Sequence, residues 1–404
     1  MRTQTDRQTD RMVRCCWLAG AVLVLGCATD GDLDASTGEL EAPLELALAS
    51  CTHEADCSGG LTCIGGACRP CSAHDQCRSD VCDQGAATSM GPGACLPESS
   101  VIYTNTSARP ACETGDGSRA NPVCEIRDAI PRAIGARYAI RVYPGRYRPF
   151  STTHRTFYVF GPGDGTAIVG EEDISAGARI GVGARVVLDG LDFGVAVLTG
   201  VICEGASLKV LRGRVRGDYQ GIRATDCDLV IDRVRAIGPT MSGLTIAGTG
   251  KYRVTNSYFI GGDRPSVVFS GPSTGVFQFN TVTGGGELHP GGIDCGTSSR
   301  TIRDSIVVGS FPAADGAQTV GACTHQRVVV GSGDLRTDPG LIHLDPVFDG
   351  QGRLLDTPAN DACCIDKGAR YVSSLYRDFF GTPRFCGTSN DIGAYEHPEP
   401  GCVD

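Results

Sequence analysis

Residues 232–282 read DRVRAIGPTMSGLTIAGTGKYRVTNSYFIGGDRPSVVFSGPSTGVFQFNTV, and this stretch decides the fold. It holds Asp232, Asn256 and Asn280, spaced 24 residues apart, and an apolar residue follows each of them two positions later. The series continues outside the stretch with spacings of 24, 19 and 24 residues at Asp189, Gly213 and Asp304. A repeat of this length, with alternating apolar residues and no helical stripe, predicts the stacked coils of a β-solenoid.

Stacked coils bring equivalent residues about 4.8 Å apart. We therefore expect Asn256 and Asn280 to hydrogen-bond to the equivalent side chains above and below them, and the aspartates of the series to cap local backbone amides. The expected role of every residue in the series is structural. Cysteines within the repeats are predicted to bridge neighbouring coils, and their pairing stays open: Cys203, Cys227, Cys295 and Cys323.

Composition and charge narrow the class of protein. The chain has 404 residues, 56 glycines and only 6% aromatic residues, which suits tight turns and β coils better than a helical bundle. Its formal net charge of −10 argues against nucleic acid or an anionic membrane as a partner. We expect a monomer that meets a membrane only through a lipid anchor.

The N-terminal residues 1–27 have the form of an export signal. Arg11 and Arg14 precede a short apolar run, which ends in the segment Val24-Leu25-Gly26-Cys27. This ending resembles a bacterial lipobox, and the resemblance implies lipid attachment at Cys27; ordinary signal cleavage is the alternative. The sequence leaves open whether the chain starts at Met1 or Met12.

The cysteine count agrees with export. Twenty-one cysteines are too many for a reducing cytosol unless they bind metal. If Cys15 and Cys16 leave with the signal and Cys27 carries lipid, eighteen remain, and this even number suits a set of disulfides. The predicted location is the outer membrane or cell surface as a lipoprotein, or otherwise the medium as a secreted protein.

Two short segments precede the solenoid. Residues 28–50 carry six acidic and no basic side chains and are interpreted as an extended tether. Residues 51–97 hold eight cysteines in two similar halves, Cys51-Thr-His-Glu-Ala-Asp-Cys57 and Cys71-Ser-Ala-His-Asp-Gln-Cys77. A segment this short needs disulfides to fold, so a duplicated four-cysteine module is predicted. A zinc or redox site at Cys68-Arg-Pro-Cys71 is the less favoured reading.

The main domain shows motifs at both ends. It opens with Val101-Ile-Tyr103, a helical stretch over residues 125–136 and the segment Ile140-Arg-Val-Tyr-Pro-Gly-Arg-Tyr147. This start resembles right-handed parallel β-helix proteins of the pectate-lyase-like superfamily, in which a short helix caps the first coil. The segments Asp345-Pro-Val-Phe348, Asp378-Phe-Phe-Gly-Thr-Pro-Arg384 and Asp391-Ile-Gly-Ala-Tyr-Glu396 resemble the C-terminal cap of bacterial choice-of-anchor or β-helix repeat proteins.

The resemblance implies an all-β fold, a right-handed parallel β-helix over residues 101–347 with a C-terminal cap over residues 348–404. It implies no reaction, because the family is described by its architecture. Cysteines in and after the cap are expected to cross-link it through disulfides: Cys363, Cys364, Cys386 and Cys402.

Catalytic motifs are weak. The Trp-Ile-Asp-His and Arg-x-Pro-x-x-Arg segments of pectate lyases and the paired-aspartate motif of polygalacturonases are missing from the sequence. Asp226 and Asp228 are the nearest pair of carboxylates for a glycosidase, with solvated side chains or a cation site as alternatives. His289 and Asp294 lie in a probable loop and are the other weak candidates. No cofactor is indicated, although Ca²⁺ is compatible with an acidic polysaccharide substrate.

Alternating arginines offer a binding surface. Arg212, Arg214, Arg216, Arg233 and Arg235 are predicted to face solvent, with Arg214 over Arg233 and Arg216 over Arg235. Asp192 is expected one coil earlier in line with Arg216. An exposed face of salt bridges is the simpler interpretation. The alternative is a strip that grips the carboxylates or sulfates of an acidic glycan.

The sequence therefore favours a non-catalytic binding or adhesion lipoprotein that recognises a polysaccharide or another surface protein. The alternative is a polysaccharide lyase or glycoside hydrolase that acts on an acidic polysaccharide. A spacer that presents the cysteine module to a partner is a third hypothesis.

Overall fold

The computed structural model describes residues 49–84, 88, 90, 92–170, 174–194, 197–284, 292–309, 317–370, 377–384 and 387–397. The predicted signal and lipidation site, most of the tether, His289, Cys386 and Cys402 lie outside these residues. All of the described residues belong to one compact unit.

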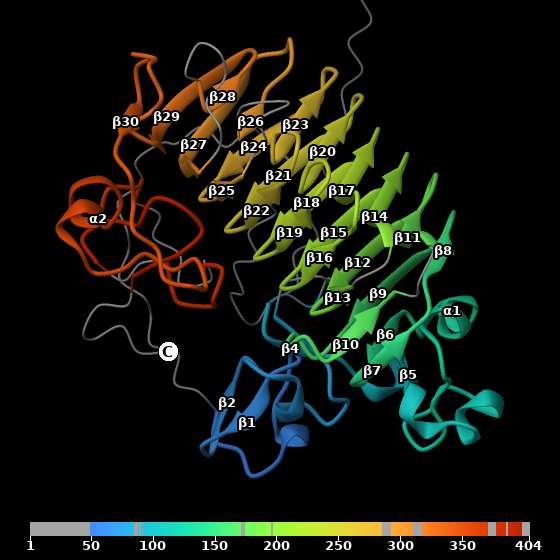
Figure 1. Ribbon diagram of the computed structural model, residues 1–404. Helices are drawn as coiled ribbons and strands as arrows, with labels where there is room; N and C mark the ends of the chain where they lie inside the picture. The colour runs from blue at the N-terminus through green and yellow to red at the C-terminus, as the bar shows by residue number, and fades with distance from the viewer. Residues whose placement is uncertain are drawn as a thin grey trace, which may run out of the picture. The chain divides into compact units, whose positions relative to one another are not determined.

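The described chain is built on parallel β strands that wind into a β-helix, and Figure 1 shows their stacked rows. Consecutive coils pair in register, as in the strands β12, β15 and β18. This confirms the predicted all-β solenoid. The 18-stranded sheet comprises β5 (Val101–Thr104), β6 (Ala139–Val142), β7 (Gly145–Tyr147), β9 (Thr156–Phe160), β10 (Ala167–Val169), β12 (Arg185–Asp189), β13 (Asp192–Phe193), β15 (Ser207–Leu211), β16 (Arg214–Arg216), β18 (Asp228–Asp232), β19 (Arg235–Gly238), β21 (Lys251–Thr255), β22 (Tyr258–Gly261), β24 (Thr274–Gln278), β25 (Thr281–Thr283), β27 (Arg300–Val308), β29 (Cys323–Val330) and β30 (Leu341–His343).

A second sheet of eight strands closes each coil. Apolar side chains from both sheets fill the interior, where Phe259, Phe269 and Phe277 pack against one another. The second sheet comprises β8 (Phe150–Thr152), β11 (Ile174–Ile180), β14 (Val197–Glu204), β17 (Gln220–Thr225), β20 (Leu244–Ala247), β23 (Val267–Ser270), β26 (Ile293–Asp294) and β28 (Thr319–Val320).

Helices are few and short. The predicted helix over residues 125–136 is limited to α1 (Ile126–Ala129) and a 3₁₀ turn (Ile130–Arg132), because Pro131 lacks the amide donor that would continue it. The other helix is α2 (Pro358–Cys363). No helix in the described part of the chain has the length and apolar character of a membrane span. Further 3₁₀ turns cover Glu54–Asp56, His74–Gln76, Glu98–Ser100, Thr106–Ala108 and Ala111–Thr114.

The coils turn at a column of left-handed residues, and this column differs from the predicted series. Strand pairing aligns Asp189 with Leu211 and Leu211 with Asp232, so the next residue of each coil, Gly190, Arg212 and Arg233, occupies the turn. Asn256 and Asp304 belong both to the predicted series and to the observed turn column, whereas Gly213 belongs only to the predicted series. The predicted alignment of the coils was wrong because it matched residues of similar type, whereas the coils differ in length. The column has φ between 42° and 68° at Gly190, Arg212, Arg233, Asn256, Phe279, Asp304 and Arg327.

The predicted ladder is confirmed for Asn256, whose amide donates to Asp232 Oδ1, the preceding member of the series, at 2.8 Å. It is wrong for Asn280, whose Oδ1 accepts from the backbone nitrogen of Ser257 at 3.0 Å. Within the described residues no hydrogen bond joins Asn256 and Asn280.

Disulfides occur in the coils and in the cysteine module, as predicted, whereas the described cap cysteines bond only to each other. Cys203–Cys227 and Cys295–Cys323 join neighbouring coils. In each half of the cysteine module the first cysteine pairs with the third and the second with the fourth: Cys51–Cys63, Cys57–Cys68, Cys71–Cys82 and Cys77–Cys95. Cys68 and Cys71 thus belong to separate disulfides. Cys112–Cys124 was not predicted, and Cys363 pairs with its neighbour Cys364.

The cysteine module packs on the first coils. It contains the hairpins β1 (Thr62–Ile64) with β2 (Ala67–Arg69) and β3 (Cys82–Asp83) with β4 (Ala94–Cys95). Val81 and Leu96 are buried against Val101, Tyr103 and other apolar residues of the outer sheet face. The Tyr103 hydroxyl donates to the Ser79 carbonyl at 3.0 Å. The module is therefore part of the folded body, which disfavours the hypothesis of a presented, independent module.

Candidate functional site: an arginine pocket

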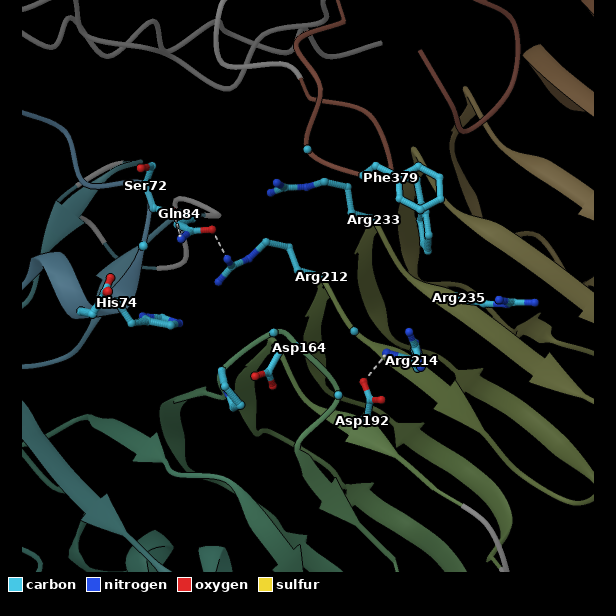
Figure 2. A pocket seen from close by; sticks show the side chains of 18 of the residues that line it. Ser72, His74, Gln84, Asp164, Asp192, Arg212, Arg214, Arg233, Arg235 and Phe379 are labelled. Atoms are coloured by element: carbon cyan, nitrogen blue, oxygen red, sulfur yellow. Dashed lines mark hydrogen bonds between the residues drawn. The ribbon is translucent and has the colours of Figure 1, made fainter. Parts of the chain in front are cut away.

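Three separate parts of the chain surround a pocket of about 910 Å³, shown in Figure 2. The second half of the cysteine module forms one wall, the coils form the floor, and the C-terminal segment adds an aromatic edge. Its main lining residues are Ser72, Ala73, His74, Asp75 and Gln84 from the module; Arg141, Pro162–Gly165, Asp192, Arg212–Arg214, Arg233 and Arg235 from the coils; and Gln351 and Phe379–Gly381 from the C-terminal segment.

The turn column brings Arg212 and Arg233 to this pocket. Both have positive φ, 48° and 56°, a conformation that is uncommon for a residue other than glycine or asparagine. A carboxylate binds each guanidinium. Arg212 Nε lies 2.7 Å from Oδ1 of Asp189, one coil earlier, and Arg233 Nε lies 2.9 Å from Oδ2 of Asp232, the residue before it. The module also takes part, because Arg212 Nη1 donates to Gln84 Oε1. The fold thus places arginines at turn positions whose backbone conformation favours glycine or asparagine.

The strands after the turn supply two more arginines. Register aligns Arg214 with Arg235 and Arg216 with Ile237, so the predicted stacking of Arg214 over Arg233 and of Arg216 over Arg235 is wrong. Asp192 aligns with Arg214 instead of Arg216, and its Oδ1 accepts the Arg214 backbone amide at 3.1 Å. Arg235 lies over the Tyr258 ring at 5.5 Å, and its buried Nε has no hydrogen-bond partner.

Two carboxylates share the pocket with opposite pKa shifts. Burial raises the pKa of Asp192, although the Arg214 amide and charge oppose this shift. Burial also acts to raise the pKa of Asp164, but hydrogen bonds from Thr166 outweigh it and lower that pKa. Asp192 therefore takes up a proton at a higher pH than Asp164 does.

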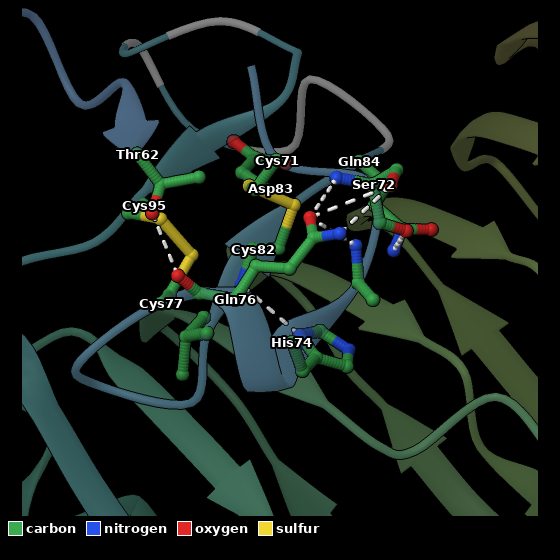
Figure 3. Close-up of a disulfide and its surroundings, with 12 residues drawn as sticks. Thr62, Cys71, Ser72, His74, Gln76, Cys77, Cys82, Asp83, Gln84 and Cys95 are labelled. Atoms are coloured by element: carbon green, nitrogen blue, oxygen red, sulfur yellow. Dashed lines mark hydrogen bonds between the residues drawn. A yellow bond between two sulfur atoms is a disulfide. The ribbon is translucent and has the colours of Figure 1, made fainter. Parts of the chain in front are cut away.

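His74 stands at the module wall in the neutral form. Its Nδ1 accepts the Cys82 backbone amide at 3.0 Å, as Figure 3 shows beside the Cys71–Cys82 and Cys77–Cys95 disulfides. Burial, and then the charges of Arg141 and Arg212, lower the pKa of His74 to about 3, against a smaller opposing effect of the Gly161 carbonyl. A histidine in this state donates a hydrogen bond from Nε2.

The aromatic edge comes from Phe379 and Phe380, whose rings meet edge to face at 5.0 Å. Phe380 is 38% exposed, and the Arg353 guanidinium lies over its ring at 4.2 Å. An exposed ring beside a polar pocket can pack against the apolar face of a sugar.

The remaining predicted candidates lie elsewhere. Arg216 is exposed but does not line the pocket. Asp226 Oδ1 accepts the Thr249 amide at 2.9 Å and Asp228 Oδ1 accepts the Lys251 amide at 3.1 Å, so both cap the backbone of the next coil. Arg223, on β17, pairs with Glu204 at 3.1 Å. Asp294 lines a different depression, and His289 falls outside the described residues.

Sequence reasoning missed His74, Arg141, Asp164 and Phe379. Only His74 could have been noticed in the sequence, because each half of the duplicated module has a histidine near its first cysteine. His53 lies two residues after Cys51, and His74 lies three residues after Cys71. The other three come from distant segments, and nothing in their local sequence indicates a shared pocket.

Metal ligands are not evident in the described residues. The two three-cysteine groups, Cys51, Cys57 and Cys68, and Cys71, Cys77 and Cys82, consist of disulfide-bonded cysteines, which cannot act as thiolate ligands. Ca²⁺ binding therefore stays a prediction.

Comparison with known proteins leaves the family open. No model of a known protein family matches the chain, and no curated protein matches it. Among solved structures it is similar to the crystal structure of pectate lyase Pel9A, with 12% sequence identity and a TM-score of 0.33 over 74% of this chain and 96% of that chain. The parallel β-helix described above rests on the strand pairing of this chain itself.

Proposed function

We propose that this protein is a non-catalytic binding protein of the cell surface that holds an acidic polysaccharide in the arginine pocket. The observation that carries the proposal is the convergence of five arginines on one pocket: Arg141, Arg212, Arg214, Arg233 and Arg235. They outnumber the lining carboxylates of Asp75, Asp164 and Asp192, which leaves the lining with a formal excess of two positive charges. Guanidinium groups bind carboxylates and sulfates in bidentate geometry.

The size and the walls of the pocket support a glycan. A volume of about 910 Å³ is near the upper end for small-ligand pockets and suits a short stretch of a sugar chain. Phe380 offers an exposed ring at the edge, while Asp164 and Asp192 offer acceptors for sugar hydroxyls.

The test replaces Arg214 by Ala together with Arg233 by Asn. Asn suits the left-handed turn that Arg233 now occupies, as Asn256 shows in the same column, so the double variant should fold at least as well. Losing two charge-assisted contacts of about 1.5 kcal/mol each should weaken binding to an acidic polysaccharide about 100-fold and reduce its salt dependence. Binding is measured by calorimetry against a panel of uronate and sulfated polymers.

Arg216→Ala is the matched control, since Arg216 lies on the same strand as Arg214 but outside the pocket. If the double variant and the wild type bound the polymer with equal affinity, the pocket would not be the binding site. Absence of binding to every polymer of the panel would defeat the proposed function.

A separate prediction concerns Asp192. Because burial raises its pKa, Asp192 gains a proton as the pH falls from 7, and the affinity for an anion should rise as this negative charge is lost. Asp192→Asn should tighten binding of dextran sulfate about threefold to tenfold at pH 7 and flatten the pH dependence. The sulfate groups of this polymer do not titrate, so a wild-type affinity that stays constant as the pH is lowered from 7 to the acid limit of the folded state would contradict the prediction.

The same two carboxylates favour hydrolysis as the second candidate function. A raised pKa suits a general acid and a lowered pKa suits a base or nucleophile, the division found in glycosidases. New reducing ends in the polymer incubations, lost in Asp192→Asn and Asp164→Asn, would replace the binding proposal by this one. A lyase would instead produce unsaturated uronate absorbance.

Attachment to the cell surface through lipid at Cys27 is part of the proposal. Every cysteine of the described residues is disulfide-bonded, which supports an oxidising compartment. Cys27→Ser should move the protein from the membrane fraction to the soluble fraction of the producing cell; an unchanged distribution would count against the lipid anchor.

A further inference from the structure

We propose that the inner end of the pocket, formed by His74, Arg141 and Arg212, is a subsite that binds one oxyanion, a carboxylate or sulfate group. The inference rests on the proposed function, because it names the chemical group that the glycan places there. It also assigns a role to the cysteine module, which supplies one of the three donors.

Three hydrogen-bond donors are left without partners at this place. His74 Nε2, Arg141 Nε and Arg212 Nη2 are buried, and within the described residues none of them makes a hydrogen bond of normal geometry, although the Gly161 carbonyl lies close enough to His74 to act on its pKa. Buried polar atoms without partners are rare, since each costs the free energy of its lost hydration. Three of them around one pocket indicate that something else supplies the acceptors.

The chemistry of the donors defines the ligand. His74 accepts the Cys82 amide through Nδ1, so its Nε2 carries the proton and can only donate. The arginine nitrogens can only donate as well. A group that satisfies all three must offer several acceptor oxygens, and the positive charges of Arg141 and Arg212 favour a negative one, which describes a carboxylate or a sulfate.

Arg141 provides the second, independent observation. It is 93% buried, and within the described residues no carboxylate forms an ion pair with it. Its Nη1 donates to the Phe160 carbonyl at 3.2 Å, and its guanidinium lies 5.6 Å from the centre of the Tyr143 ring. A buried cation without a counter-ion is costly unless an anion joins it.

The neighbouring acids bind other groups. Asp189 Oδ1 binds Arg212 Nε, while its buried Oδ2 has no hydrogen-bond partner among the described residues, and Asp164 accepts from Thr166. Asp80, whose charge also acts on Arg141, binds Arg119 and Tyr143. The positive charge of Arg141 is therefore not matched by a carboxylate of its own.

The test measures binding of small anions to the full exported chain with its disulfides formed. Sodium sulfate and sodium glucuronate are titrated separately by calorimetry, with methyl glucuronate ester as the neutral control. We expect at least one of the two anions to bind at a single site and the ester to bind at least tenfold more weakly.

Two variants remove donors without disturbing the fold. His74→Asn keeps an acceptor for the Cys82 amide and loses the Nε2 donor. Arg141→Met keeps an apolar stem and removes the buried charge, so it should leave the melting temperature unchanged or raise it. Each should weaken binding of the small anion at least tenfold, whereas Arg253→Met, at an exposed position on β21, should leave it unchanged.

The outcomes separate the two proposals. Binding of sulfate or glucuronate that both variants weaken supports the subsite, and the preferred anion identifies the group. Absence of binding by either anion, or equal binding by the variants, overturns the subsite even if acidic polymers still bind. Small-anion binding without polymer binding would support the subsite and reject the proposed polysaccharide function.

Discussion

Replacing Arg384 by Met should lower the free energy of unfolding by about 3–5 kcal/mol, because the change removes the cation whose charge favours the ionised forms of the buried acids Asp378 and Asp391. Arg384 is completely buried in the C-terminal segment. Its Nε donates to Asn256 Oδ1 at 2.9 Å, its Nη2 donates to the Gly393 carbonyl at 2.7 Å, and its Nη1 lies 3.4 Å from Glu396 Oε2. The guanidinium also lies 4.6 Å from the Phe279 ring. It thereby ties the segment Asp391–Glu396 to the turn column.

Urea unfolding followed by circular dichroism measures this effect, and a loss below 1 kcal/mol would contradict it. Glu396→Gln is the matched control, since an amide oxygen can still accept from the Asp391 backbone amide. Burial, and then the charge of Asp391, raise the pKa of Glu396. The folded state therefore keeps a proton that the unfolded chain has already lost, and the free energy of unfolding should fall as the pH rises through the window between the two pKa values. The glutamine variant should be nearly as stable as the wild type at neutral pH and show a shallower fall.

Removing the Cys77–Cys95 disulfide by a double change to Ala should cost about 3 kcal/mol and also weaken polysaccharide binding at least tenfold. This disulfide holds the half of the module that carries His74 and Gln84, and both of its cysteines are buried. Without it the hairpin of β3 and β4 keeps only the Cys71–Cys82 link to the segment around the 3₁₀ turn at His74. The wall of the pocket should then loosen, which thermal unfolding and polymer calorimetry both report.

The Cys57–Cys68 disulfide is the natural comparison, because it occupies the equivalent place in the first half of the module. That half supplies no lining residue of the pocket. Its removal should reduce stability while leaving the affinity intact. If both double variants lost affinity equally, the effect would come from general unfolding of the module and not from the pocket wall.

The sequence by itself determined the class of fold and the presence of disulfides in the coils and the cysteine module, but not their pairing. The 24-residue spacing and the apolar alternation require stacked coils, since a coil buries its apolar residues only against its neighbours. The similarity of the two half-modules predicted a duplicated four-cysteine unit, and both halves indeed share one pairing. These properties are local or periodic, so they are visible along one chain. The arginine strip was also identified from its alternation, and four of its five members line the pocket.

Only the tertiary structure decided register, partners and the pocket itself. Coils of unequal length shift the alignment, so Arg214 stacks on Arg235 and the turn column runs through Arg212 and Arg233. His74, Arg141 and Phe379 lie far apart in the sequence and meet only because the module and the C-terminal segment fold back onto the coils. The physical reason is that burial and hydrogen bonding depend on neighbours in space. A pocket that three distant segments share leaves no periodic trace in any one of them.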